Sequence, residues 1–153
     1  MPAGRAVDRL GAGRPVLAGL GGMAIGLLAL AATAARCGVA GYVAAIMVVT
    51  ASYALFQAAN NTAVMKDVAA EQRGVISAVL NLSRNLGLIT GASAMGAVFR
   101  FASGAADVTR AQPPAAAAGM AAVFAVAAVL TLAALAISLG WRAAARPPVL
   151  AAG

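Results

Sequence analysis

The sequence has 153 residues, of which 63% are hydrophobic and only 10% are charged, and its formal net charge is +7. A soluble domain is normally about 45–50% apolar and about 25% charged, so this composition excludes a soluble globular protein and predicts a membrane protein with several spans. The basic residues form no run interleaved with aromatic residues. The positive charge therefore indicates cytoplasmic loop charge and not nucleic-acid binding.

The composition lacks the residue types on which many enzymes and metal sites depend. The sequence has no histidine, and Cys37 is its one cysteine. It therefore offers no internal disulfide, no cysteine- or histidine-based metal site and no histidine to activate a serine. No nucleophile–base pair or phosphate-binding loop is visible. We expect no enzymatic activity, no metal and no cofactor.

Four apolar segments predict four transmembrane helices, at about 15–35, 39–62, 74–99 and 116–140. The first has about 21 residues. At about 1.5 Å per residue it reaches roughly 31 Å, enough to cross the hydrocarbon core. A cleaved secretory signal is the alternative for this segment, but the apolar core of a signal is only about 7–15 residues long. We therefore predict an all-α membrane protein whose transmembrane region covers residues 15–140.

Short polar segments join these helices. The charged hinge from Lys66 to Arg73 carries Asp67 and Glu71 just ahead of the third helix, where the positive end of the helix dipole favours carboxylates. The Pro113–Pro114 pair is expected to end a loop just before the fourth helix. The other polar segments are a cytoplasmic segment over 1–14, a tight turn over 36–38, a loop over 100–115 and a disordered cytoplasmic tail over 141–153.

Basic residues are distributed unequally between the two sides that four spans define. The side with both termini and the hinge has seven of them, and the other side has three. Because cytoplasmic loops carry an excess of Lys and Arg, both termini are predicted to lie in the cytoplasm, with the chain in the inner membrane. The seven are Arg5, Arg9, Arg14, Lys66, Arg73, Arg142 and Arg146, and the three are Arg36, Arg100 and Arg110.

Polar residues recur at helical spacing inside the second and third predicted helices. Arg84 is the one charge that falls within a span, and a charge at that depth costs about 2.5–3.5 kcal/mol unless it faces a protein interior or a wet cavity. The alternative is structural: interhelical hydrogen bonds worth about 0.6 kcal/mol each and, for Arg84, pairing with Asn81 or backbone carbonyls, or reaching the cytoplasmic interface. The candidate residues for a substrate cavity or gate are Tyr53, Gln57, Asn60, Asn61, Asn81 and Arg84, with Asn85 at the same helical spacing.

Small residues recur every four positions on two of the predicted helices. Gly22 and Gly26 do so on the first, and Ser83, Gly87 and Gly91 do so on the third. Such spacing lets two helix backbones approach closely in lipid. These five residues are therefore the candidate helix-packing positions, although the pattern is common by chance in a chain rich in glycine and alanine.

Two stretches resemble a known family. The segment from Gly4 to Arg14 resembles the cytoplasmic loop signature of the major facilitator superfamily, which is Gly, three residues, an acid, a base, one residue, Gly and then bases. Gly4, Asp8, Arg9 and Gly11 match by position, whereas Ala12 and Gly13 stand where bases are expected and Arg14 follows late. The segments FQAANNTAVMKDV and EQRGVISAVLNLSRNLGLITGASAMGAVF are similar to the tenth and eleventh helices of twelve-helix drug/proton antiporters, or to the twelfth and thirteenth of the fourteen-helix type.

This resemblance implies that the chain is the last four helices of a transporter, part of the C-terminal half of the fold. The intact parent is then expected to export small amphipathic compounds by proton-coupled efflux. Its partners are membrane lipid, a small-molecule substrate and the missing N-terminal helices, with no nucleic acid. Proton coupling needs a titrating group within the pathway. All four acids fall outside the predicted spans, so we expect residues 1–153 alone not to transport.

Two other functions stay open. One is a complete four-helix exporter that works as a dimer, as in the small multidrug resistance family. That family depends on a glutamate in its first helix, and the first predicted helix here has none. The other is a membrane scaffold or assembly partner that transports nothing.

Overall fold

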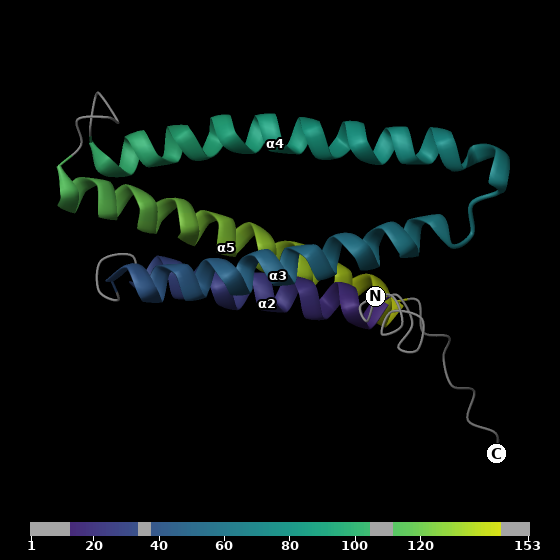
Figure 1. The fold of residues 1–153 in the computed structure, drawn as a ribbon, viewed down its shortest axis with the longest axis horizontal. Coiled ribbons are helices and arrows are strands. Elements are labelled where there is room, and N and C mark those ends of the chain that lie inside the picture. Colours follow the sequence, from purple (N-terminus) through teal and green to yellow (C-terminus); the bar gives the residue numbers. More distant parts are fainter. Residues whose placement is uncertain (1–12, 34–37, 105–111, 145–153) are drawn as a thin grey trace, which may run out of the picture.

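The computed structural model describes residues 13–33, 38–104 and 112–144 (Figure 1). Its elements are α2 (Gly13–Thr33), α3 (Gly38–Met65), the short 3-10 helix η1 (Ala70–Gln72), α4 (Arg73–Ser103) and α5 (Pro113–Ala144). The helices α2, α3, α4 (together with η1) and α5 are each long and apolar enough to cross a membrane. The described residues contain no strand. This confirms the predicted all-helical class with four candidate spans.

Two helix boundaries differ from the predicted ones at the α4–α5 connection. α5 begins at Pro113, not near residue 116, because the first-turn N–H groups of a helix have no intrahelical partner and proline lacks that N–H. The N–H of Ala116 donates to the carbonyl of Gln112 at 2.9 Å. α4 continues past residue 99 to Ser103 and is capped by Gly104 in the left-handed conformation, with φ 62°. Arg100 therefore lies in the last turn of α4, where a cation favours the helix dipole.

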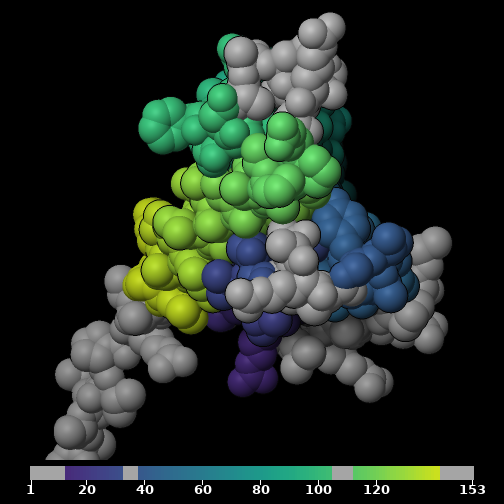
Figure 2. Space-filling model, turned by 90° about the vertical axis from the view of Figure 1, so that its left-hand side faces the viewer, coloured from purple at the N-terminus to yellow at the C-terminus, as the bar shows by residue number. Residues whose placement is uncertain are grey.

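α2 is the central helix of the bundle. It packs against α3 on one side and α5 on the other, whereas α4 packs on α5 and on η1. Viewed along the helices, α4 lies at the top, α5 below it, and α2 and α3 at the bottom (Figure 2). The buried apolar side chains of the described residues come mainly from α2; they are Leu20, Ala24, Leu27, Leu30, Ala45, Ala59 and Ala128.

Glycines bring α2 close to the backbone of α3. A Cβ added at Gly19 would lie 2.8 Å from the Cβ and the backbone nitrogen of Phe56 and 2.9 Å from its Cα. A Cβ at Gly22 would meet Ser52, and one at Gly26 would lie 2.6 Å from a methyl carbon of Val49 and 3.4 Å from the carbonyl oxygen of Ala45. Three residues of one helix face are therefore glycine where the two helices touch. Such close approach supplies the packing that joins helices in lipid.

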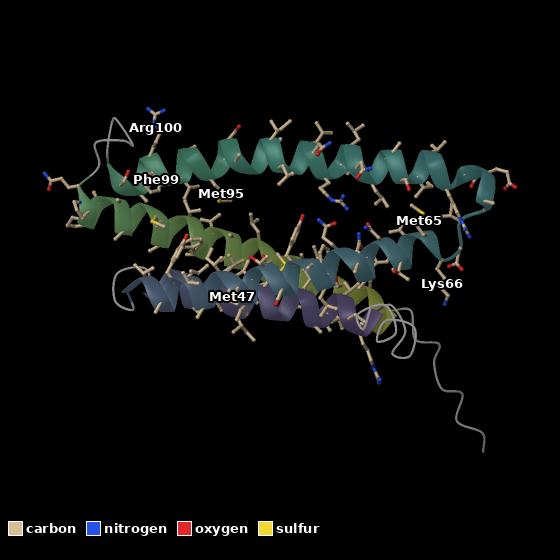
Figure 3. The ribbon with its side chains drawn as sticks, viewed as in Figure 1. Met47, Met65, Lys66, Met95, Phe99 and Arg100 are labelled. Carbon is tan, nitrogen blue, oxygen red and sulfur yellow. The ribbon has the colours of Figure 1, made fainter. Side chains whose placement is uncertain are left out.

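α4 is held to the bundle mainly near its C-terminal end. Figure 3 shows Met95 and Phe99 directed from α4 toward α5, and Arg100 directed away from it. A Cβ added at Gly119 of α5 would lie 2.8 Å from ring carbons of Phe99, so this ring rests on the α5 backbone. No residue of α4 is buried. Toward the hinge, α5 moves away from α4 and leaves the face of α4 between them uncovered within the described chain (Figure 1).

Candidate functional site

α3 presents two different faces along its second half. Ser52 and the backbone of Phe56 face α2 through the close contacts at Gly22 and Gly19, whereas the Phe56 residue also lines a cavity on the other side. Polar side chains spaced three or four residues apart line a cavity between α3 and α4. These are Tyr53, Gln57, Asn60 and Asn61. Because one face is committed to α2, the polar face is turned toward α4.

The N-terminal half of α4 is also two-faced. Its outward face is apolar and exposed, with 65% of the Val75 side chain, 60% of Leu82 and 65% of Ile89 accessible. Such a face suits lipid contact. The opposite face carries the polar residues Ser77, Asn81, Ser83 and Arg84, which line cavities toward α3. The polar face of α4 thus faces the polar face of α3 across these cavities.

The polar residues of α3 and α4 meet in two adjoining cavities. One has a volume of about 270 Å³ and is lined by Tyr53, Phe56, Gln57, Asn60, Asn61, Leu80, Ser83 and Arg84. The other has a volume of about 220 Å³ and is lined by Asn61, Met65, Ser77, Leu80, Asn81 and Arg84. Arg84 lines both. The structure therefore brings together all six candidate cavity residues, whereas Asn85 lines neither of these two cavities.

A third cavity continues this space to the hinge. It has a volume of about 540 Å³ and shares Met65 and Ser77 with the second cavity. Its other lining residues are Thr62, Lys66 and Arg73. Met65 is directed toward α4, and Lys66 lies at the edge with its side chain directed away from α4 (Figure 3). We call the three cavities together the α3–α4 groove.

Two side-chain hydrogen bonds organise the groove. The amide of Gln57 donates to the hydroxyl of Tyr53, one turn back along α3. The Nη1 of Arg84 donates to the Oδ1 of Asn81 at 3.1 Å, one turn back along α4. Within the described residues this is the one polar contact of the half-buried Arg84 side chain. A guanidinium has five N–H donors, so most of its donor capacity remains open to the groove.

Every charged side chain that lines the α3–α4 groove is cationic. They are Lys66 and Arg73 at the hinge end and Arg84 deeper inside. The Nε of Arg73 donates to the carbonyl of Val68 at 3.3 Å, which ties this side chain to the hinge. No acidic residue falls within α2, α3, α4 or α5. The groove can therefore offer a positive charge and neutral hydrogen-bonding groups, without a carboxylate of its own helices.

The candidate packing residues have two different environments. Gly22 and Gly26 lie against α3, as described above. No atom of the described structure lies within 4 Å of a Cβ added at Gly87 or Gly91. Ser83, which shares their spacing, lines the groove. The close contact that the prediction missed is Gly19, whose signal is its place three residues before Gly22 on the same helix face.

The N-terminal signature is largely outside the described residues. Gly4, Asp8, Arg9 and Gly11 belong to the residues that the structure does not describe, as do the turn residues 34–37, the loop residues 105–111 and the tail residues 145–153. Arg14 is described and lies exposed in the first turn of α2. Among the described residues, no group of three or more His, Cys, Asp or Glu side chains could hold a metal ion.

Fold and site together define a helical protein with four helices that are long and apolar enough to cross a membrane and with a cationic polar groove between two of them. Comparison with protein-family models, with curated proteins and with solved structures gives no match.

Proposed function

We propose that the chain is the C-terminal four-helix portion of a major facilitator type transporter, of the drug/proton antiporter kind, and that the intact parent exports small amphipathic compounds. The observation that carries the proposal is the α3–α4 groove. Polar residues from two helices, including Arg84, the one charge within the spans predicted from the sequence, line adjoining cavities. Polar and ionisable residues at membrane depth mark substrate or ion pathways when they face a cavity and not the lipid.

Two further features support a partial transporter. The uncovered inner face of α4, with open space at Gly87 and Gly91, has the small residues that a neighbouring helix requires. Transporters of this type form their site between two halves, so neighbours from the rest of the parent would cover this face. The excess of Lys and Arg on one side supports cytoplasmic termini in the inner membrane, and the groove then reaches the cytoplasmic surface at the hinge.

The proposal is tested with the intact reading frame. We expect in-frame DNA upstream of Met1 to encode further hydrophobic segments. Cells that express the longer protein should accumulate less of a fluorescent amphipathic dye, and an uncoupler should abolish this difference. Arg84→Ala should remove the efflux at normal expression, whereas Val79→Ala, on the exposed outer face of α4, should not. The absence of hydrophobic segments upstream, or an active Arg84→Ala variant, would refute the proposal.

The chain by itself gives a second test. No carboxylate lies within its four long helices, so purified residues 1–153 in proteoliposomes should show no proton-linked efflux. Efflux by the reconstituted chain that an uncoupler stops would instead favour the complete four-helix exporter. Native mass spectrometry in detergent checks the same alternative, because that exporter would be a stable dimer.

A further inference from the structure

The α3–α4 groove contains an arginine, Arg84, whose one polar contact among the described residues is with a neutral amide. Arg84 lies eleven residues after Arg73 in α4. This spacing corresponds to about 16 Å along the helix axis, so Arg84 lies well below the hinge. A charged side chain within a membrane span faces a protein interior or a wet cavity and pairs with a partner there. The contact of Arg84 with Asn81 is a bond to a neutral amide oxygen, which leaves the positive charge uncompensated.

The surroundings of Arg84 favour an acidic group as its partner. A guanidinium presents its donors in a planar fork that matches a carboxylate, sulfonate or phosphate group. The amide and hydroxyl groups of Asn61, Asn60 and Ser83 line the same cavities and can donate further hydrogen bonds to such a group. Lys66 and Arg73 line the third cavity at the hinge, where Asp67 and Glu71 also lie, so the net positive charge of the groove comes from Arg84. A cationic compound would meet Arg84 in this groove, and no carboxylate lines it.

The other walls of the groove require an apolar body attached to that acidic group. Phe56, Leu80 and Met65 line the cavities beside Arg84. α3 and α4 separate with distance from the hinge (Figure 1), and in the described chain they make few contacts with each other. A compound that partitions into the bilayer can therefore enter sideways, with its acidic group on Arg84 and its apolar part against these side chains.

From these observations we propose that the α3–α4 groove binds an amphipathic anion whose acidic group pairs with Arg84. The proposal names the substrate class of the transport path and rests on the proposed function for that role, but the binding itself belongs to the chain and is measured without transport. The anion has two sources, a free amphipathic acid or the headgroup of an anionic phospholipid.

The test uses the full chain of 153 residues in phosphatidylcholine nanodiscs, with dansyl-labelled undecanoate as the probe and empty nanodiscs as the blank. The probe should bind above the blank, and decanoate should displace it whereas decyltrimethylammonium should not. Arg84→Gln should weaken binding at least about tenfold, which corresponds to about 1.4 kcal/mol. Arg84→Lys, which keeps the charge but lacks the planar fork, should weaken binding less than Arg84→Gln does.

Matched variants separate anion binding from misfolding. Arg100→Gln removes the same charge from the last turn of α4, outside the groove, and should leave binding unchanged. Leu80→Trp keeps Arg84 but fills the space that both cavities share, so it should also weaken binding. Circular dichroism and a monodisperse elution profile establish that each variant is folded.

Two results would overturn the proposal: equal displacement of the probe by the cationic and anionic competitors, or unchanged affinity in Arg84→Gln. A second set of nanodiscs that contain phosphatidylglycerol distinguishes the two sources. If phosphatidylglycerol competes with the probe and this competition disappears in Arg84→Gln, the groove binds a lipid headgroup. If phosphatidylglycerol does not compete, the groove binds a free acid. Efflux by the intact reading frame without preference for anions would refute this inference and leave the transporter proposal standing. Anion binding by the chain, without any efflux by the intact reading frame, would support this inference and refute the transporter proposal.

Discussion

The contact between α2 and α3 at Gly19 makes a quantitative prediction for the variant Gly19→Ala. The new Cβ would lie 2.9 Å from the Cα of Phe56 and 2.8 Å from its backbone nitrogen. Carbon atoms pack best at about 3.5–4.0 Å, so the two helices would have to separate by about 0.6–1.1 Å. Backbone atoms cannot rotate out of the way as a side chain can. Overpacking of this kind costs about 1–3 kcal/mol.

Gly21→Ala is the matched control on the same helix. Nothing lies within 4 Å of a Cβ at Gly21. Alanine also has a higher helix propensity than glycine, by about 0.8–1.0 kcal/mol in water, so this variant should be as stable as the wild type or more stable. The assay is unfolding in mixed dodecylmaltoside–SDS micelles, followed by circular dichroism. Equal free energies of unfolding for the two variants would show that α2 and α3 do not approach as closely as described.

Three further outcomes are expected. Gly119→Ala should destabilise the α4–α5 contact by about 1 kcal/mol in the same assay, and Phe99→Leu should relieve this because the ring is the group that the new Cβ meets; no relief would place the strain elsewhere. Gly38→Ala should cost about 1–2 kcal/mol because Gly38 has φ 58° at the start of α3, and an unchanged stability would argue against that conformation. An alkaline phosphatase fused next to Pro113 should be active outside the membrane and one fused next to Lys66 inactive, and the reverse pattern would invert the proposed orientation.

The positions of the four helices could be predicted from hydropathy, because each apolar segment is long enough to cross the bilayer and ends at charged or proline-containing sequence. The predicted ends of the helices were less accurate, because capping residues extend the helices past their apolar segments. Gly104 adopts the left-handed conformation beyond the last strongly apolar residue of α4. Pro113 begins α5 and lies before the first strongly apolar residue of that helix. Signals of this kind are local and were available in the sequence, as the Ser103–Gly104 pair illustrates.

The membership of the candidate site could be predicted because polar residues three or four apart share one face of a helix. Tyr53, Gln57 and Arg84 therefore line the same groove. Which helices meet could not be predicted in this way. Gly22 and Gly87 have the same spacing to a second glycine, yet only Gly22 has a neighbouring helix in the described chain. The spacing indicates that a backbone can be approached, and the partner is decided by the rest of the fold.

The unequal lengths of the helices determine how the chain fits a bilayer. α2 has 21 residues and α4 has 31. These lengths correspond to about 32 Å and about 46 Å, against a hydrocarbon core of about 30 Å. Even a tilt of about 40°, the upper end of the usual range, leaves α4 spanning roughly 36 Å. Bilayer thickness will therefore set how far both ends of α4 emerge among the phosphate groups, and a thicker membrane will draw the hinge toward its surface.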